Sequence, residues 1–303
     1  MQTLILSILS LLAFAANSVL GRLALGQESI DAGGFTLLRL FSAIVMMVLI
    51  VVLRGYFFPY RLIPEQLNKE SGSIKVREFF QRSGSPLAAL MLFIYAIGFS
   101  YAYIALDTAT GALILYAGVQ LTMNAGSIWL GHKITIKDIV GIALAFLGLA
   151  YLLLPYLNTP SIWDFLVMFL AGSSWAIYTL LGKDSKDAIG DTAANFIYTL
   201  PAVLLLVLGQ IFYIQAIWTV EGVVLAVISG AVTSALGYSL WYIALRGLNV
   251  SIAAVIQLSV PLIAALAAVV FLSEVITLRL MIAGLLILGG IAVVIFSWPN
   301  RAA

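Results

Sequence analysis

The segment Gly98-Phe-Ser-Tyr-Ala-Tyr-Ile-Ala-Leu106 recurs 139 residues later as Gly237-Tyr-Ser-Leu-Trp-Tyr-Ile-Ala-Leu245, with six of nine positions identical. A second pair of segments, Leu130-Gly-His-Lys-Ile-Thr-Ile-Lys137 and Leu272-Ser-Glu-Val-Ile-Thr-Leu-Arg279, repeats at an offset of 142 residues. The chain therefore contains an internal duplication, and its fold depends on how the two copies are oriented.

The amino-acid composition places both copies in lipid. Of the 303 residues, 63% are hydrophobic and 9% are charged, whereas a soluble domain carries about 25% charged residues. A bilayer core about 30 Å thick requires roughly 20 apolar residues per helix. Segments of that length predict ten transmembrane spans, at residues 3–25, 32–53, 87–106, 109–130, 138–156, 161–182, 193–214, 222–245, 250–272 and 278–298.

The order of these spans predicts the topology. Spans one to five repeat as spans six to ten, and because five is odd the two copies must lie in opposite orientations across the membrane. We therefore expect an all-α polytopic membrane protein made of two inverted five-helix repeats, at residues 1–157 and 158–303. The first span reads as a retained helix and not as a signal peptide, because no basic residue precedes it and its apolar run is too long.

Positive charge predicts the orientation in the membrane. Lysine and arginine concentrate in the even-numbered loops, above all in the long basic segment 54–85, and such loops are typically cytoplasmic. We therefore expect a multi-pass protein of a bacterial-type inner membrane with both termini in the cytoplasm.

Several classes of function are disfavoured by composition. The net charge of +2 is too small to indicate nucleic-acid binding. The chain has no cysteine and a single histidine, His132, which argues against a disulfide framework and against a zinc or iron centre. We expect no cofactor, no nucleic-acid partner and no enzymatic activity. The expected partners are a small-molecule substrate and the lipid bilayer, and the oligomeric state stays open.

The ends of the two copies carry motifs of a known family. Pro261-Leu-Ile-Ala-Ala is followed by Phe271-Leu-Ser-Glu274 and by a threonine-led helix that ends in Leu-Gly-Gly290, and Trp129-Leu-Gly-His132 is a weaker first-copy version. With these motifs, the Tyr-Ile-Ala-Leu ends of spans three and eight, and Arg39 early in span two, the chain resembles EamA-type members of the drug/metabolite transporter superfamily. The resemblance implies alternating access through a central cavity, and export of amino acids or similar small metabolites.

Polar and aromatic residues at membrane depth are the candidates for substrate binding, because such groups usually face the interior of a bundle. The predicted set is Asn17, Tyr116, Gln120, Asn124, Trp175, Tyr178, Tyr238, Trp241 and Gln257. Alternatively, the amides join neighbouring helices through hydrogen bonds, and the aromatic rings only fill space in the helix packing. A helical proline frees the carbonyl four residues earlier, so we expect Pro261 to kink span nine and to leave the Gln257 carbonyl unpaired. We expect Pro201 to kink span seven.

Charged residues are few within the spans. Arg39 either snorkels to the outer interface, pairs structurally, or lies near a substrate carboxylate. The motif residue Glu274 is replaced by His132 in the first copy, which makes the halves electrostatically unequal, and both are candidates for gating or coupling. No Asp or Glu lies in the middle of a span, so a carboxylate proton relay is not indicated.

The sequence supports an exporter of amino acids or similar amphipathic metabolites as the first hypothesis. The alternative is a multidrug or toxic-compound efflux transporter, which a buried carboxylate for cationic drugs would favour, and none is visible. A membrane-embedded enzyme would need paired acids or a nucleophile–base set at depth. A structural membrane protein without transport activity also remains open.

Overall fold

The computed structural model describes residues 2–26, 28–57, 83–106, 108–129, 135–154, 161–212, 216–264, 266 and 277–297. Over these residues the chain is helical, and the one isolated bridge that they form joins Ile30 to Trp218. The first half contains α1 (Gln2–Gly26), α2 (Ala32–Phe57), α4 (Pro86–Ala105), α5 (Thr108–Trp129) and α6 (Ile136–Leu153). The second half contains α7 (Ile162–Gly182), α8 (Ala188–Tyr198), α9 (Leu200–Phe212), α10 (Val220–Ile228), η4 (Ser229–Leu236), α11 (Gly237–Leu245), α12 (Val250–Ile256), η5 (Gln257–Ser259) and α14 (Leu278–Ser297).

Each predicted span coincides with a helix or with consecutive helices of the described chain, which confirms an all-α polytopic membrane fold. Among the described residues, six helical segments are long and apolar enough to cross a bilayer: Gln2–Gly26, Ala32–Arg54, Pro86–Ala105, Ile162–Gly182, Ala188–Phe212 and Val220–Leu245. Many large apolar side chains on their outer faces are exposed, as is expected of surfaces that face lipid.

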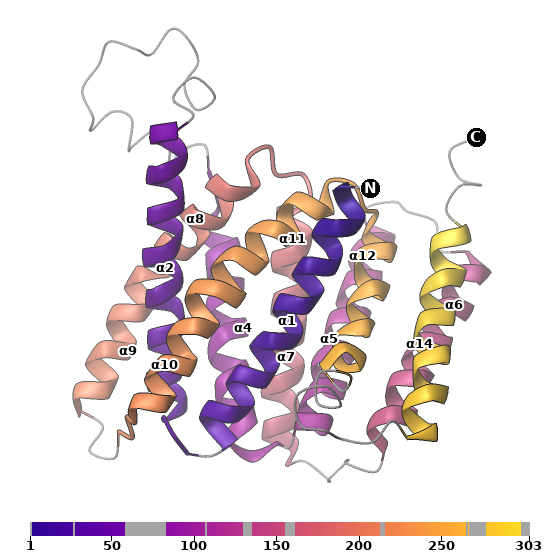
Figure 1. Cartoon of the computed structure of the whole chain (residues 1–303), viewed down its shortest axis with the longest axis horizontal. Helices are drawn as coiled ribbons and strands as arrows, with labels where there is room; N and C mark the ends of the chain where they lie inside the picture. The colour runs from indigo at the N-terminus through magenta and orange to yellow at the C-terminus, as the bar shows by residue number, and fades with distance from the viewer. Residues whose placement is uncertain are drawn as a thin grey trace, which may run out of the picture.

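The direction of the helices is visible in Figure 1. α1 begins and α14 ends at the same edge of the bundle, where α2 also ends and α4 begins. α1 runs away from this edge and α7, the first helix of the second half, runs toward it. The first helices of the two halves therefore point in opposite directions, as an inverted arrangement requires.

Span seven begins earlier than the sequence predicted. The expected start was residue 193, whereas α8 begins at Ala188. Asp191 lies in the first turn of α8 and lowered the apolar character of this stretch. Its carboxylate accepts hydrogen bonds from the Gly84 backbone N–H and the Ser185 hydroxyl, so it is satisfied at the end of the bundle.

Three spans of the second half are not continuous α-helices. Span seven is interrupted at Thr199, two residues before Pro201, where the Thr199 hydroxyl donates to the Phe196 carbonyl. Span eight contains η4, a π-helical segment between α10 and α11. Span nine passes from α12 into the 3₁₀ turn η5 and continues as helix through Val260–Ala264.

Spans five and ten form a closely packed pair at one side of the bundle (Figure 1). A side chain added at Gly141 of α6 would place its Cβ 2.7 Å from the Gly290 carbonyl oxygen of α14. The reciprocal substitution at Gly290 would bring Cβ against the Gly141 carbonyl oxygen. The absence of side chains therefore lets the two backbones meet, as small residues do in membrane helix pairs. α6 packs mainly against α14 and only lightly against α5.

Candidate functional site

A buried arginine occupies the centre of the helix bundle. Arg39 lies seven residues after the start of α2, about 10 Å along the helix axis, and 1% of its surface is exposed. Its Nε donates to the Ser234 hydroxyl at 3.0 Å, and its Nη2 donates to the hydroxyls of Tyr238 at 2.6 Å and Tyr95 at 3.4 Å. Arg39 therefore does not snorkel to an interface, because its guanidinium is held by three buried hydroxyls.

The guanidinium is incompletely satisfied. Its Nη1 is buried and has no hydrogen-bond partner, and no carboxylate of the described residues forms an ion pair with it. The guanidinium carbon lies 5.3 Å from the ring centroid of Tyr95 and 5.4 Å from that of Phe99, which offers cation–π attraction but no counter-charge. A buried charge without a partner of opposite sign is energetically costly.

The groups around Arg39 reflect the internal duplication. Tyr95 and Ser234 are separated by 139 residues, and so are Phe99 and Tyr238; this is the offset of the repeated Gly98 and Gly237 segments. The arginine thus contacts equivalent positions of spans three and eight. Gly230 of η4 permits this approach, because a Cβ there would collide with the Arg39 carbonyl oxygen.

Aromatic rings pack beside the guanidinium, with Trp175 of α7 at their centre. The Trp175 ring centroid lies 4.6 Å from that of Tyr238, 5.1 Å from that of Tyr95 and 5.2 Å from that of Phe14. Trp241 packs edge-on against Phe14 at 5.6 Å. The rings are therefore in mutual contact, in the edge-on and tilted geometries that aromatic pairs prefer.

Two further predicted tyrosines show different surroundings. Tyr178 stacks on Tyr242 at 4.9 Å, and its backbone carbonyl accepts from the Tyr242 hydroxyl at 2.9 Å. The Tyr178 and Trp175 ring centroids are 5.5 Å apart, so Tyr178 adjoins the central rings. Tyr116 of α5 is buried in the core.

The amide of Gln257 joins span nine to span six. Its Oε1 accepts from the Trp175 indole N–H at 2.7 Å, and its Nε2 donates to the Ala253 carbonyl at 2.9 Å. The expectation of an unpaired Gln257 carbonyl was wrong, because the 3₁₀ turn lets that carbonyl accept from the Val260 backbone N–H. The proline at position 261 is thus accommodated by a tighter turn.

Asn17 links span one to the π-helical segment of span eight. Its Oδ1 accepts from the hydroxyls of Ser229 at 2.6 Å and Thr233 at 3.1 Å. Because Ser234 is in the same segment and binds Arg39, Asn17 adjoins the central site through η4.

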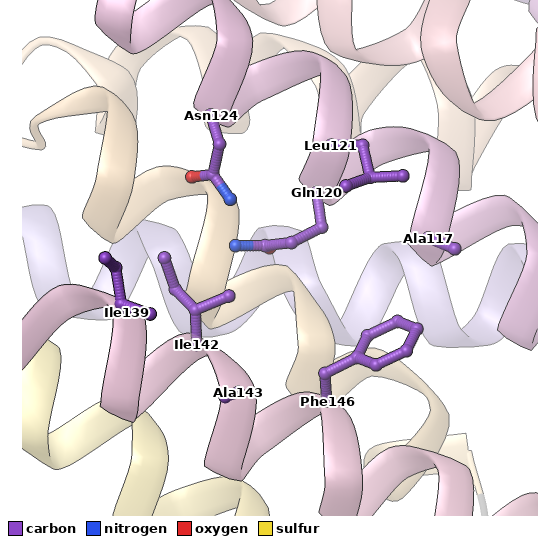
Figure 2. Close-up of a pocket in the computed structure, with 8 residues that line it drawn as sticks. All are labelled: Ala117, Gln120, Leu121, Asn124, Ile139, Ile142, Ala143 and Phe146. Carbon is purple, nitrogen blue, oxygen red and sulfur yellow. The ribbon is translucent and has the colours of Figure 1, made fainter. Parts of the chain in front are cut away.

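Gln120 and Asn124 lie elsewhere, in a cavity of about 310 Å³ between α5 and α6. Figure 2 shows both amides directed into the space that faces α6. The lining residues are Ala117, Gln120, Leu121, Asn124, Ile139, Ile142, Ala143 and Phe146. The structure therefore separates two members of the predicted substrate-binding set, Gln120 and Asn124, from the central cluster.

Some central residues were not predicted as site residues, and two predicted charges fall outside the described chain. Tyr95, Phe99, Ser234 and Phe14 contact the central groups, and the repeat offset applied to Tyr95 and Tyr238 would have found Ser234 and Phe99. His132 and Glu274 lie outside the described residues, as does most of the basic segment 54–85. Within the described part of that segment, Arg54 forms an ion pair with Asp187 at 2.5 Å.

Known proteins resemble this chain over about two thirds of its length or more. An uncharacterized protein of Pseudomonas aeruginosa is 39% identical over 302 residues, which cover 100% of this chain and 97% of that protein. An uncharacterized transporter of Archaeoglobus fulgidus is 26% identical over 212 residues, which cover 67% of this chain and 73% of the relative. A protein of known crystal structure has the same fold, with a TM-score of 0.68 at 18% identity over 98% of this chain and 99% of that one.

The second half carries the family signature, because residues 162–296 match the EamA-like transporter family. This match confirms the family that the motifs predicted and identifies a multi-pass transporter fold. The chain therefore carries an EamA-like transporter domain at residues 162–296.

Proposed function

We propose that the chain exports small amphipathic metabolites that carry a carboxylate, with amino acids as the first class to test. The observation that carries this proposal is the Arg39 guanidinium, which is buried, unpaired by any carboxylate of the described residues, and left with a free Nη1. A substrate carboxylate would supply the missing counter-charge and accept from the unused N–H group.

The neighbouring rings suit the rest of such a substrate. Trp175, Tyr95 and Tyr238 pack in contact beside the guanidinium, and together they offer apolar surface to a hydrophobic side chain. Because Nη1 is buried, substrate can reach it only after the surrounding helices separate. Alternating access between two inverted halves provides that separation.

Membrane placement is inferred from the distribution of positive charge. The end of α2 and the start of α4, which flank the basic segment 54–85, lie at the same edge of the bundle as the start of α1 and the end of α14. We assign that edge to the cytoplasm of a bacterial inner membrane. The unit that moves would be one five-helix repeat against the other, at residues 1–157 and 158–303.

Multidrug efflux is the second candidate, favoured by the aromatic cluster, which could hold a cationic drug through cation–π contacts. The positively charged Arg39 guanidinium lies against the same rings and would repel a cationic ligand bound to them. The repulsion makes carboxylate substrates the better match.

Counterflow in proteoliposomes tests the proposal. Proteoliposomes that contain the purified full-length protein are preloaded with one unlabelled amino acid of a panel, and uptake of the same labelled amino acid is followed. Phenylalanine, phenylalaninamide and tetraphenylphosphonium are then added outside as competitors. We expect amino acids to exchange and phenylalaninamide, which lacks the carboxylate, to compete poorly. Arg39→Gln should lower the initial rate about tenfold or more, since a charge-assisted hydrogen bond contributes roughly 1.5–3 kcal/mol.

Arg54→Gln is the matched control, because Arg54 is a partly exposed arginine of the same helix. Its rate should stay within about twofold of the parent, as surface ion pairs contribute little. Exchange of tetraphenylphosphonium with no exchange of any amino acid would refute amino-acid export and support multidrug efflux. Amino-acid exchange that is insensitive to Arg39→Gln in folded protein would remove Arg39 from the site.

A further inference from the structure

The cavity between α5 and α6 contains buried polar atoms that have no partner in the protein. Gln120 is 4% exposed, and neither its Nε2 nor its Oε1 forms a hydrogen bond. The Oδ1 of Asn124, one helical turn later, is also buried and unpaired. Buried amides are normally satisfied, so three unpaired atoms beside one cavity favour a polar ligand that the amides turn to meet.

We infer that this cavity binds an uncharged amphiphile dissolved in the bilayer, with a hydrocarbon body and one hydroxyl or primary amide group. A hydroxyl or amide both donates and accepts, so it can serve the Gln120 Nε2 donor together with the Oε1 or Oδ1 acceptors. No such match is available to a pure hydrocarbon. The inference does not rest on the proposed transport of carboxylates.

The lining excludes a charged ligand. Apart from Gln120 and Asn124, the residues that line the cavity are aliphatic or aromatic: Ala117, Leu121, Ile139, Ile142, Ala143 and Phe146. No ionisable side chain among these lining residues can pair with a carboxylate, phosphate or ammonium, and an unpaired charge at this depth is costly. The cavity therefore differs in ligand class from the Arg39 site.

The position of the cavity indicates entry from the lipid. Gln120 lies twelve residues after the start of α5, about 18 Å along its axis and near the middle of the helix. Leu121 and Ile139 on the rim are 61% and 57% exposed, and at this depth an exposed surface faces hydrocarbon. A ligand that partitions into the bilayer thus reaches the cavity without crossing an aqueous vestibule.

The surrounding helices leave room for a ligand to enter. α6 is packed mainly on α14 and only lightly on α5, so the α6–α14 pair can shift without breaking the central cluster. The volume of about 310 Å³ is at the lower end of small-molecule sites. It suits a single-chain solute better than a lipid with two acyl chains.

Photolabelling of the full-length protein in lipid nanodiscs tests this inference. Four diazirine probes with the same ten-carbon chain are compared, ending in a hydroxyl, a primary amide, a carboxylate or a methyl group. We expect the hydroxyl and amide probes to label the 117–124 and 139–146 peptides saturably, about fivefold more than the methyl probe, which corresponds to roughly one hydrogen bond. Unlabelled decan-1-ol should compete, whereas dioleoylglycerol at the same membrane concentration should not.

Variants separate binding from folding. Gln120→Leu with Asn124→Leu should abolish the preference for the hydroxyl probe while leaving the unfolding transition unchanged or raised, because unpaired buried polar groups are removed. Ala143→Phe should block labelling by filling the cavity. The matched control is Leu285→Phe in α14, because the Leu285 side chain is 75% exposed and faces lipid.

Three results would overturn the inference: equal labelling by the methyl probe, unchanged labelling in the double leucine variant, or full competition by dioleoylglycerol, which would make the cavity a lipid contact. Arg39→Gln should lower transport without changing this labelling. Failure of one proposal can therefore be distinguished from failure of the other.

Discussion

Removing the Tyr238 hydroxyl tests whether the buried charge of Arg39 depends on its hydrogen bonds. In Tyr238→Phe the Arg39 Nη2 loses its 2.6 Å acceptor and keeps only Tyr95 at 3.4 Å, while Nη1 already has none. Loss of a buried hydrogen bond to a charged group costs about 1.5–3 kcal/mol. We expect the free energy of unfolding, measured by denaturant titration in mixed micelles, to fall by that amount.

Tyr242→Phe is the matched control, since Tyr242 lies one turn further along α11 and is equally buried. Its hydroxyl donates to the neutral Tyr178 carbonyl at 2.9 Å, and neutral hydrogen bonds in membrane proteins average about 0.6 kcal/mol. The two variants should therefore differ by about 1–2 kcal/mol, with Tyr238→Phe the less stable.

A double-mutant cycle attributes the difference to the guanidinium. In an Arg39→Met background the hydroxyl of Tyr238 has no charge to satisfy, so Tyr238→Phe should then cost no more than the control. Equal losses for the two phenylalanine variants in the parent protein, or a Tyr238→Phe penalty that survives in Arg39→Met, would refute the reasoning.

Three other perturbations have defined outcomes. Gln257→Leu should reduce transport in proteoliposomes more than it reduces the amount of folded protein, because it leaves the Trp175 indole N–H without its acceptor; equal losses would favour a purely structural role. Gly290→Leu should disrupt the α6–α14 pair and lower the thermal midpoint, whereas Gly289→Leu, where a Cβ meets nothing within 4 Å, should not; similar midpoints would contradict the close packing. Arg54→Gln should destabilise by about 0.2–1 kcal/mol and less at high salt, because its ion pair with Asp187 is partly exposed; a larger loss in mixed-micelle titrations would show that this pair matters more than its exposure implies.

The sequence predicted the helices and their order because hydropathy, helix length and an odd-numbered repeat are local or periodic properties. It located Arg39 in span two and Gln257 in span nine. Hydropathy failed at the start of α8, where Asp191 is satisfied by partners that include a residue far away in the chain. The prediction for the Gln257 carbonyl also failed, because a 3₁₀ turn replaced the expected free acceptor.

The arrangement of the side chains depends on which helices become neighbours. Trp175 and Gln257 are 82 residues apart, and Arg39 and Ser234 are 195 apart, so no local pattern predicts either contact. Gln120 and Asn124 share a face of one helix, as their spacing of four indicates. That face meets α6 instead of the aromatic centre, and spacing alone cannot reveal this.

The π-helical segment of span eight makes the two copies mechanically unlike. A π-turn holds more residues than an α-turn, so η4 rotates α11 about the helix axis relative to α10. One span can thereby direct Ser229 toward Asn17 and Tyr238 toward Arg39. Its counterpart α4 is an uninterrupted α-helix. Conversion of η4 into α-helix would rotate α11 and move its aromatic rings around the bundle centre. α4 contains no π-helical segment, so it cannot make the corresponding motion.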